Sequence, residues 1–167
     1  DLMAAKLGRL PAETRDVLGQ LACLGNVADV TALTWVQDKA EEVTNARMWE
    51  AIRGGLVFRV GSNYVFAHDR VQEAAYELIS AGERPAAHLR IGRALASHTP
   101  PEALHEAIFD IVNHLNRGAA LIQSKTEREQ AAALNLIAGK RAMSSTAYSS
   151  ARSYLAQGVA LLSDAAW

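Results

Sequence analysis

Residues 56–66 read LVFRVGSNYVF, two short apolar runs on either side of the turn-forming sequence Gly-Ser-Asn. Along residues 56–60, one set of alternate positions is wholly apolar and the other set includes Arg59. Residues 64–66 then resume an extended pattern. Alternation with a period of two, interrupted by turn residues, is typical of a β-hairpin. We therefore predict one small hairpin at this place in the chain.

Three helical segments precede the hairpin. Residues 11–24 show helical spacing of apolar side chains between a proline, which suits a first helical turn, and a glycine, which stops a helix. Further helices are predicted over residues 31–40 and from about Thr44 to residue 53. Three short helices followed by a hairpin is the order of a winged-helix domain. We expect residues 1–80 to form such a domain, with the third helix in the recognition position and the hairpin as its wing.

The chain reads as helical after the hairpin. Asp69 stands before a stripe of apolar residues at helical spacing, and Gln72 follows three residues later. This D-x-x-Q pattern is typical of a capping box, in which the two side chains satisfy backbone N–H groups at a helix start. We predict that Asp69 caps a helix, and that residues 83–167 form antiparallel helices.

The last two predicted helices resemble a tetratricopeptide pair. Gly139, Ala142, Ala151, Leu155 and Gly158 fall near the small and large positions of that repeat. Small residues on facing helices let the backbones approach, and large residues fill the holes between turns. The helical layer is therefore expected to be tetratricopeptide-like. The expected fold class is mainly α, with the winged-helix-like part and one small hairpin coming first.

Composition limits the classes of partner. The 167 residues carry a formal net charge of −1, and 50% of them are hydrophobic. These values are typical of a globular chain with no general attraction to nucleic acid or to an anionic membrane. No apolar run approaches transmembrane length, so no membrane contact and a cytoplasmic location are expected. The sequence begins without methionine, and we expect it to be a piece of a longer protein.

No motif for catalysis or metal binding is recognised. The sequence AGKRA at residues 138–142 lacks the preceding glycine and the following hydroxyl of a phosphate-binding loop. The five histidines are scattered without the spacing of a metal site. His68-Asp69 resembles the metal-binding pair of HD-type phosphohydrolases, but that chemistry needs further His and Asp ligands. If the chain were a free-standing hydrolase of that type, it would bind a metal. We instead expect no catalytic residue, no metal ligand and no cofactor in this sequence.

Longer stretches resemble one family of signalling proteins. They are FAHDRVQEAAYELI at residues 66–79, IFDIVNHLNRGAALI at residues 108–122 and ALNLIAGKRAMSSTAYSSARSYLAQGVALLSDAAW at residues 133–167. These stretches are similar to the region that follows the ATPase module in large multi-domain kinases of bacteria and fungi. In that family, a serine/threonine-kinase-like domain precedes a STAND-type ATPase of the AAA-related class. A helical region follows, and then often a GAF domain and a histidine kinase.

The resemblance implies a role for His68 and Asp69. STAND ATPases end their nucleotide module with a winged-helix domain, and in some branches a Met-His-Asp motif stands where its last strand meets a helix. The histidine of that motif contacts the β-phosphate of bound ADP. Ala67, His68 and Asp69 occupy the matching positions, with alanine in place of methionine. In the other interpretation, His68 is a buried ring bonded to a backbone carbonyl at a strand–helix corner.

The family resemblance implies a regulatory segment without catalytic activity of its own. It would couple the nucleotide state of an upstream STAND ATPase to downstream signalling domains. ATP or ADP and Mg²⁺ would be held by the upstream domain of the parent, an ATP-binding protein kinase or sensor histidine kinase of a two-component system. The implied partners are the ATPase, kinase and GAF domains of the same chain, or a protein or peptide that docks on the helices.

Three arginines leave a second function open. Arg47 and Arg53 on the third predicted helix and Arg59 on the wing could contact DNA phosphates. The segment would then be the winged-helix DNA-binding part of a STAND-type transcriptional regulator. Trp49 and Glu50 interrupt the basic surface, and no further cluster of Lys or Arg extends it. DNA is therefore the less favoured partner.

Overall fold

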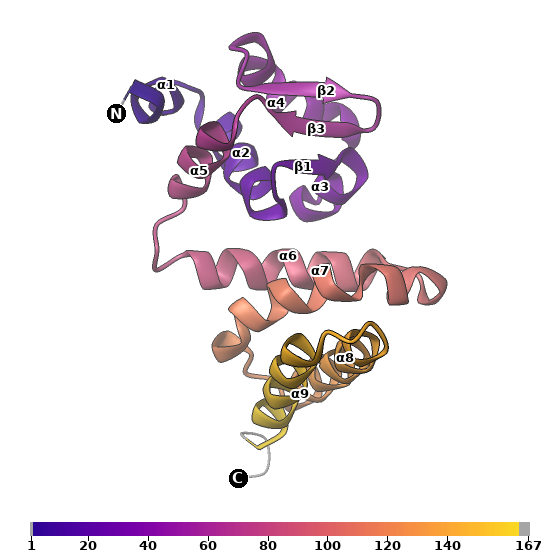
Figure 1. The fold of residues 1–167 in the computed structure, drawn as a ribbon. Coiled ribbons are helices and arrows are strands. Elements are labelled where there is room, and N and C mark those ends of the chain that lie inside the picture. The colour runs from indigo at the N-terminus through magenta and orange to yellow at the C-terminus, as the bar shows by residue number, and fades with distance from the viewer. Residues whose placement is uncertain (1, 164–167) are drawn as a thin grey trace. The chain divides into compact units, whose positions relative to one another are not determined.

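The computed structural model describes residues 2–163, which are mainly α-helical and contain one small antiparallel sheet (Figure 1). The predicted fold class is confirmed. Contacts within the chain divide it into two compact units, residues 1–84 and residues 85–167. That the first unit is a winged-helix-like domain and the second a tetratricopeptide-like domain stays a prediction.

The described part of the first unit has four helices before the hairpin and one after it. They are α1 (Leu2–Gly8), α2 (Ala12–Leu24), α3 (Val30–Gln37), α4 (Glu41–Arg53) and α5 (Asp69–Glu77). The three predicted before the hairpin are α2, α3 and α4, and α1 was not predicted. Pro11 precedes α2, and Gly25 ends it with a φ of 126°, a conformation that glycine adopts readily. The start of α4 lies before the predicted Thr44, with Glu41 and Glu42 in its first turn. Acidic side chains are favourable there because the N-terminal end of a helix is electropositive.

Three short strands form the sheet, with β3 in the middle. They are β1 (Val27–Asp29), β2 (Val57–Val60) and β3 (Asn63–Phe66), in the order β1-β3-β2. The predicted hairpin is formed by β2 and β3, which pair antiparallel with Val57 opposite Phe66. Gly61 in the connection has a φ of 59°, which a tight hairpin turn favours. The sequence did not predict β1, because three residues are too few to show a periodic pattern.

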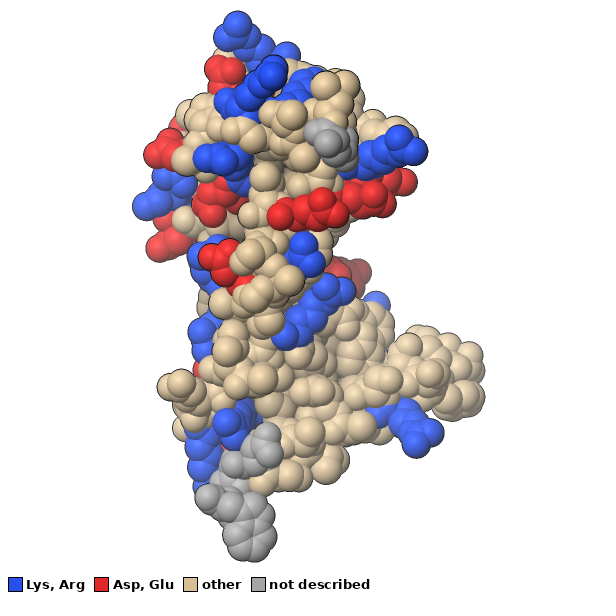
Figure 2. Space-filling view, turned by 90° about the vertical axis from the view of Figure 1, so that its left-hand side faces the viewer, with Lys and Arg blue, Asp and Glu red and all other residues tan. Residues whose placement is uncertain are grey.

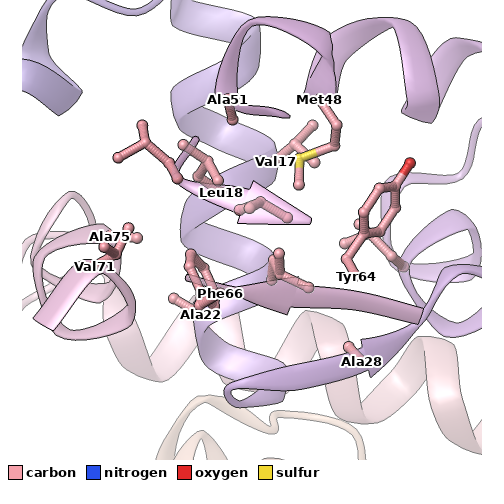
Figure 3. Packing of buried hydrophobic residues seen from close by; sticks show 14 of the residues in the cluster. Val17, Leu18, Ala22, Ala28, Met48, Ala51, Tyr64, Phe66, Val71 and Ala75 are labelled. Carbon is pink, nitrogen blue, oxygen red and sulfur yellow. The ribbon is translucent and has the colours of Figure 1, made fainter. Parts of the chain in front are cut away.

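The inner face of the sheet contributes to the hydrophobic core of the first unit. Val57, Tyr64 and Phe66 are at most 5% exposed and belong to the same cluster as Val17 of α2 and Met48 of α4 (Figure 3). Full burial of an apolar side chain of this size stabilises a fold by roughly 1.5–3 kcal/mol. The strand–helix corner after β3 is therefore attached directly to the core.

The second unit is helical throughout its described part. Its elements are α6 (Arg84–His98), α7 (Leu104–Arg117), α8 (Lys125–Ser144) and α9 (Tyr148–Ser163), with 3-10 turns at Pro101–Ala103 and Ala119–Leu121. The predicted apolar face of α7 is buried, and Ile108, Ile111 and Val112 have no exposed surface. The Ser124 hydroxyl accepts a hydrogen bond from the Glu127 N–H at 3.3 Å and so caps α8.

The contact between α6 and α7 depends on two glycines. A Cβ atom at Gly92 would lie 2.8 Å from the backbone nitrogen of Leu115. A Cβ atom at Gly118 would lie 2.5 Å from the Cβ of Leu89 and 2.5 Å from the carbonyl oxygen of Pro85. The φ of Gly118 is −108°, which any residue adopts. Lack of space, rather than backbone conformation, therefore requires glycine at this position.

The pair formed by α8 and α9 also uses small residues at its contact. A Cβ atom at Gly139 would lie 2.7 Å from Cδ2 of Leu155, and one at Gly158 would lie 3.4 Å from the carbonyl oxygen of Ala132. The glycines thus let the two backbones approach, which is the role that the spacing of small and large residues predicts.

A reciprocal amide pair joins α7 to α8. The Asn116 side chain donates to Asn135 Oδ1 at 2.8 Å, and the Asn135 side chain donates back to Asn116 Oδ1 at 2.9 Å. Asn135 has no exposed surface and also donates to the carbonyl oxygen of Ala131. A buried amide with this many partners fixes the position of α8 along α7.

Replacing Asn135 with alanine is expected to lower the free energy of unfolding by about 2 kcal/mol, because it leaves a small void and removes both bonds of Asn116 to this residue. Urea unfolding followed by circular dichroism measures the change. In a double-mutant cycle with Asn116→Ala, the double variant should lose less than the sum of the two single losses. Strictly additive losses would show that the two amides do not stabilise each other.

Candidate functional site

His68 lies between β3 and α5, where the sequence predicts a strand–helix junction. Its backbone is extended, with a φ of −159° and a ψ of 151°, and its side chain is exposed. Nδ1 of the ring accepts a hydrogen bond from the Arg70 N–H at 3.1 Å, so His68 is the N-cap of α5. The interpretation of His68 as a buried ring bonded to a carbonyl is therefore wrong.

The predicted capping box is also wrong. Asp69 is the first residue of α5 rather than its cap, although its charge still favours a helix N-terminus. Gln72 does not reach back to the helix start. Its Nε2 instead donates to the carbonyl oxygen of Ala22 at 2.8 Å and so joins α5 to α2. His68 is thus oriented by α5, which is itself bonded to the core helix α2.

The cap determines where a neutral His68 ring carries its proton. One nitrogen of a neutral imidazole donates and the other accepts. Because Nδ1 accepts from Arg70, the proton is on Nε2, which has no hydrogen-bond partner among residues 2–163. An exposed N–H of this kind can donate to a phosphate or carboxylate oxygen. The arrangement at His68 and the exposed Asp69 is therefore that of an oriented donor for an anion, placed at a helix N-terminus.

Arg47, one of the three candidate phosphate contacts, makes bonds within the first unit. Its Nη1 donates to Gln37 Oε1 at 2.8 Å, and its Nη2 lies 4.0 Å from a carboxylate oxygen of Glu13. Gln37 in turn donates to the side chain of Gln20. This polar network between α2, α3 and α4 is not apparent from the sequence, because none of its members has a distinctive spacing.

Arg59 is also engaged within the first unit, whereas Arg53 is more exposed. The guanidinium of Arg59 donates to Asn45 Oδ1 at 2.9 Å and to Glu41 at 3.2 Å. Arg53 lies 3.9 Å from Glu50 on the same helix, with 71% of its side chain exposed. A phosphate contact by Arg47 or Arg59 would have to replace existing intramolecular bonds.

Two histidines of the second unit lie in contact, although the histidines are scattered along the sequence. The Nδ1 atoms of His88 on α6 and His114 on α7 are 2.9 Å apart, and the rings stack with centroids 5.1 Å apart. Arg117 Nη1 lies 3.5 Å from His88 Nε2. A guanidinium can only donate, so His88 Nε2 accepts, and its Nδ1–H donates to His114 Nδ1. Burial, followed by the positive charge of Arg117, lowers the pKa of His114 to about 4.

Other sites considered from the sequence take different forms in the structure. Residues 138–142 lie inside α8, where the backbone N–H groups are occupied by helical bonds. Among residues 2–163, no group of three or more His, Cys, Asp or Glu side chains is placed to hold a metal ion. Within the same range, no helix combines the length and the apolar character needed to cross a membrane.

Comparison with known proteins gives one distant similarity. The chain is 26% identical over 215 aligned positions to hybrid signal transduction histidine kinase G of Dictyostelium discoideum. The alignment covers 97% of this chain but only 6% of that protein. No family model and no solved structure matches the chain. The similarity supports a signalling-protein context for this segment.

Proposed function

We propose that the chain is a regulatory segment of a signal transduction kinase and has no catalytic activity of its own. In this proposal it couples the nucleotide state of an upstream STAND-type ATPase to downstream signalling domains. The similarity of 97% of the chain to part of a hybrid histidine kinase supports the signalling context. The likeness of residues 66–69 to the Met-His-Asp junction supports the link to a nucleotide.

The observation that carries the proposal is the exposed Nε2–H of His68. The ring is held by its Nδ1 bond to Arg70, and α5 is held against α2 by the bond from Gln72 to Ala22. Such a donor can bind a phosphate oxygen of ADP in the upstream domain without first being ordered. In the proposal, loss of that contact as ADP leaves lets the first unit move against the ATPase, and ATP or ADP with Mg²⁺ stays in the upstream domain.

The proposal is tested in the full-length parent protein with two variants of His68. Asparagine is a good helix cap but has no imidazole, whereas alanine supplies neither the cap nor the ring. Both variants are expected to weaken ADP binding about tenfold and to raise basal signalling activity, because a charge-assisted hydrogen bond is lost. Isothermal titration with ADP measures the first effect, and autophosphorylation in the absence of a signal measures the second.

The stability of residues 1–167 separates sensing from capping. His68→Ala is expected to lower the free energy of unfolding by about 1 kcal/mol, and His68→Asn to leave it nearly unchanged. Glu73→Gln, at another exposed position of α5, is the matched control and should bind ADP like the natural protein. If both His68 variants keep natural ADP affinity and basal activity, His68 is only a helix cap and the nucleotide-sensing role is lost.

A further inference from the structure

One face of α9 has the spacing of a helix–helix contact but is largely exposed. Tyr148, Arg152, Leu155, Val159 and Leu162 lie alternately four and three residues apart. This spacing places side chains in one row along a helix and is typical of the seam between two packed helices. Yet Tyr148 is 67% exposed, Val159 63% and Leu162 49%. We call these five residues the α9 seam.

The α9 seam adjoins the face of α9 that packs on α8, and Leu155 lies at the boundary because its side chain also packs against Gly139 of α8. The α8-facing side is marked by Gly158 and Leu161, which are buried. The seam residues other than Leu162 line an open apolar groove, together with Met143, at the end of α8, Ala151 and Ala156. Small side chains in the floor of a groove allow the backbone of another helix to approach closely. The shape and the residue spacing therefore both fit a helix rather than an extended peptide.

Arg152 gives the α9 seam a definite charge preference. Among residues 2–163 it has no hydrogen-bond or ion-pair partner, although it lies in the groove between apolar side chains. Residues 130–163 contain no Asp or Glu, and their charged residues are Lys140, Arg141 and Arg152. Figure 2 shows that acidic side chains are scarce on the visible face of the chain near its C-terminal end. A helix that covered the seam would bury a guanidinium, which is costly unless an acidic group pairs with it.

A second copy of the chain does not meet this requirement. In a parallel pair of α9 seams, Arg152 would face the Arg152 of the other copy. In an antiparallel pair it would face apolar positions near Val159, because residues 130–163, which include α9 and the adjoining part of α8, contain no Asp or Glu. Either arrangement leaves a buried cation without a partner, so self-association through this face is disfavoured.

We propose that the α9 seam docks an amphipathic α-helix of a partner, and that the partner helix carries one Asp or Glu opposite Arg152. The apolar residues of the seam provide the buried area, and the single arginine sets the register and the choice of partner. A single charged or polar position in an otherwise apolar seam commonly has this effect on helix pairing.

The test uses the whole 167-residue chain and two synthetic helical probes. Each probe has leucine at every seam position except one, which is glutamate in the first probe and lysine in the second. Fluorescence anisotropy with labelled probes, up to about millimolar chain, measures both affinities. The glutamate probe is expected to bind at least about tenfold more tightly, a ratio that corresponds to one buried charge pair.

Variants of the chain identify the surface. Arg152→Glu should reverse the preference of the two probes, and Val159→Glu should weaken binding of both. Because both residues are exposed, the variants should unfold at the same urea concentration as the natural chain. Arg90→Glu, at an exposed arginine of α6 away from the groove, is the matched control and should leave the preference unchanged.

Five results would overturn the proposal. The probes could bind equally, or neither could bind. Arg152→Glu could leave the preference as it was. Sedimentation equilibrium could show dimers that Val159→Glu dissociates, in which case the seam is an interface between copies. Finally, vesicles of phosphatidylcholine and phosphatidylserine could bind the chain through the same residues, in which case the seam contacts a membrane.

Discussion

Replacing Gly118 with alanine is expected to lower the free energy of unfolding by about 3 kcal/mol, the upper end of the usual cost of overpacking a core. The added Cβ atom would lie 2.5 Å from the Cβ of Leu89 and 2.5 Å from the carbonyl oxygen of Pro85. Neither contact is the end of a flexible side chain, so α6 and α7 must separate to admit the methyl group. Urea unfolding gives the global loss, and hydrogen exchange in peptides from α6 and α7 shows where protection falls.

Two other glycines serve as matched controls for this prediction. A Cβ atom at Gly82 meets nothing within 4 Å, so Gly82→Ala should cost little. Gly139→Ala should be intermediate, because its close contacts at 2.7 Å and 2.8 Å are with the end of the Leu155 side chain, which can rotate. If Gly118→Ala is no more destabilising than Gly82→Ala, the close contact of α6 and α7 is not as described.

Acidification is expected to destabilise the second unit through His114. Burial and the charge of Arg117 lower its pKa from 6.5 to about 4 in the folded chain. Between pH 6.5 and pH 4 the unfolded chain therefore holds a proton at His114 that the folded chain does not. The neutral His114 ring therefore makes its full contribution to the free energy of unfolding above pH 6.5. This contribution, about 3 kcal/mol, is lost as the pH falls from 6.5 to 4.

Comparison with His114→Asn isolates this contribution from other titrating groups. The asparagine carbonyl oxygen lies near the position of Nδ1 and can accept from His88, but it does not titrate. The free energy of unfolding is measured by urea titration at several values between pH 7 and pH 4.5. The natural chain should lose more stability over this range than the variant. Parallel curves for the two proteins would show that His114 is not kept neutral by its surroundings.

The hairpin illustrates what the sequence predicts well and where it stops. The pairing of β2 with β3 and the turn at Gly61 follow from local patterns and are confirmed. The alternation of residues 56–60 does not show which side of β2 faces the core. The structure buries Val57, which belongs to the same alternate set as Arg59, whereas Phe58 and Val60 of the wholly apolar set are 50% and 59% exposed. The side of a short strand that faces the core depends on which helices cover it, and a period of two does not contain this information.

The capping error at His68 has a different origin. Asp69 with Gln72 fits a capping box, and the preference for aspartate at a cap is stronger than that for histidine. In the structure α5 starts one residue earlier, with His68 as its cap, and Gln72 makes a distant bond to Ala22 on α2 instead of reaching back to the helix start. A contact between residues 50 positions apart cannot be read from local spacing. The location of the candidate site was thus predictable, but the orientation of its ring was not.

The contacts made by the arginines and the exposed face of α9 show the same limit. The sequence identifies Arg47 and Arg59 as cations. It does not show that they donate hydrogen bonds to Gln37 and Asn45, respectively. It identifies the row that includes Val159 as apolar but gives no sign that this row is left uncovered. Helical spacing predicts a surface that can be buried, and only the arrangement of neighbouring helices determines whether it is.

The side-chain cap of α5 and a positive charge on the His68 ring are mutually exclusive. Nδ1 can accept from the Arg70 N–H only while it carries no proton. An anion that drew a second proton onto the ring would gain a stronger electrostatic partner at the expense of the bond from the Arg70 N–H, while the His68 carbonyl oxygen would keep its bonds from Val71 and Gln72. Anion capture by the charged ring and weakening of the α5 cap would then be a single event at the corner that joins the sheet to α5.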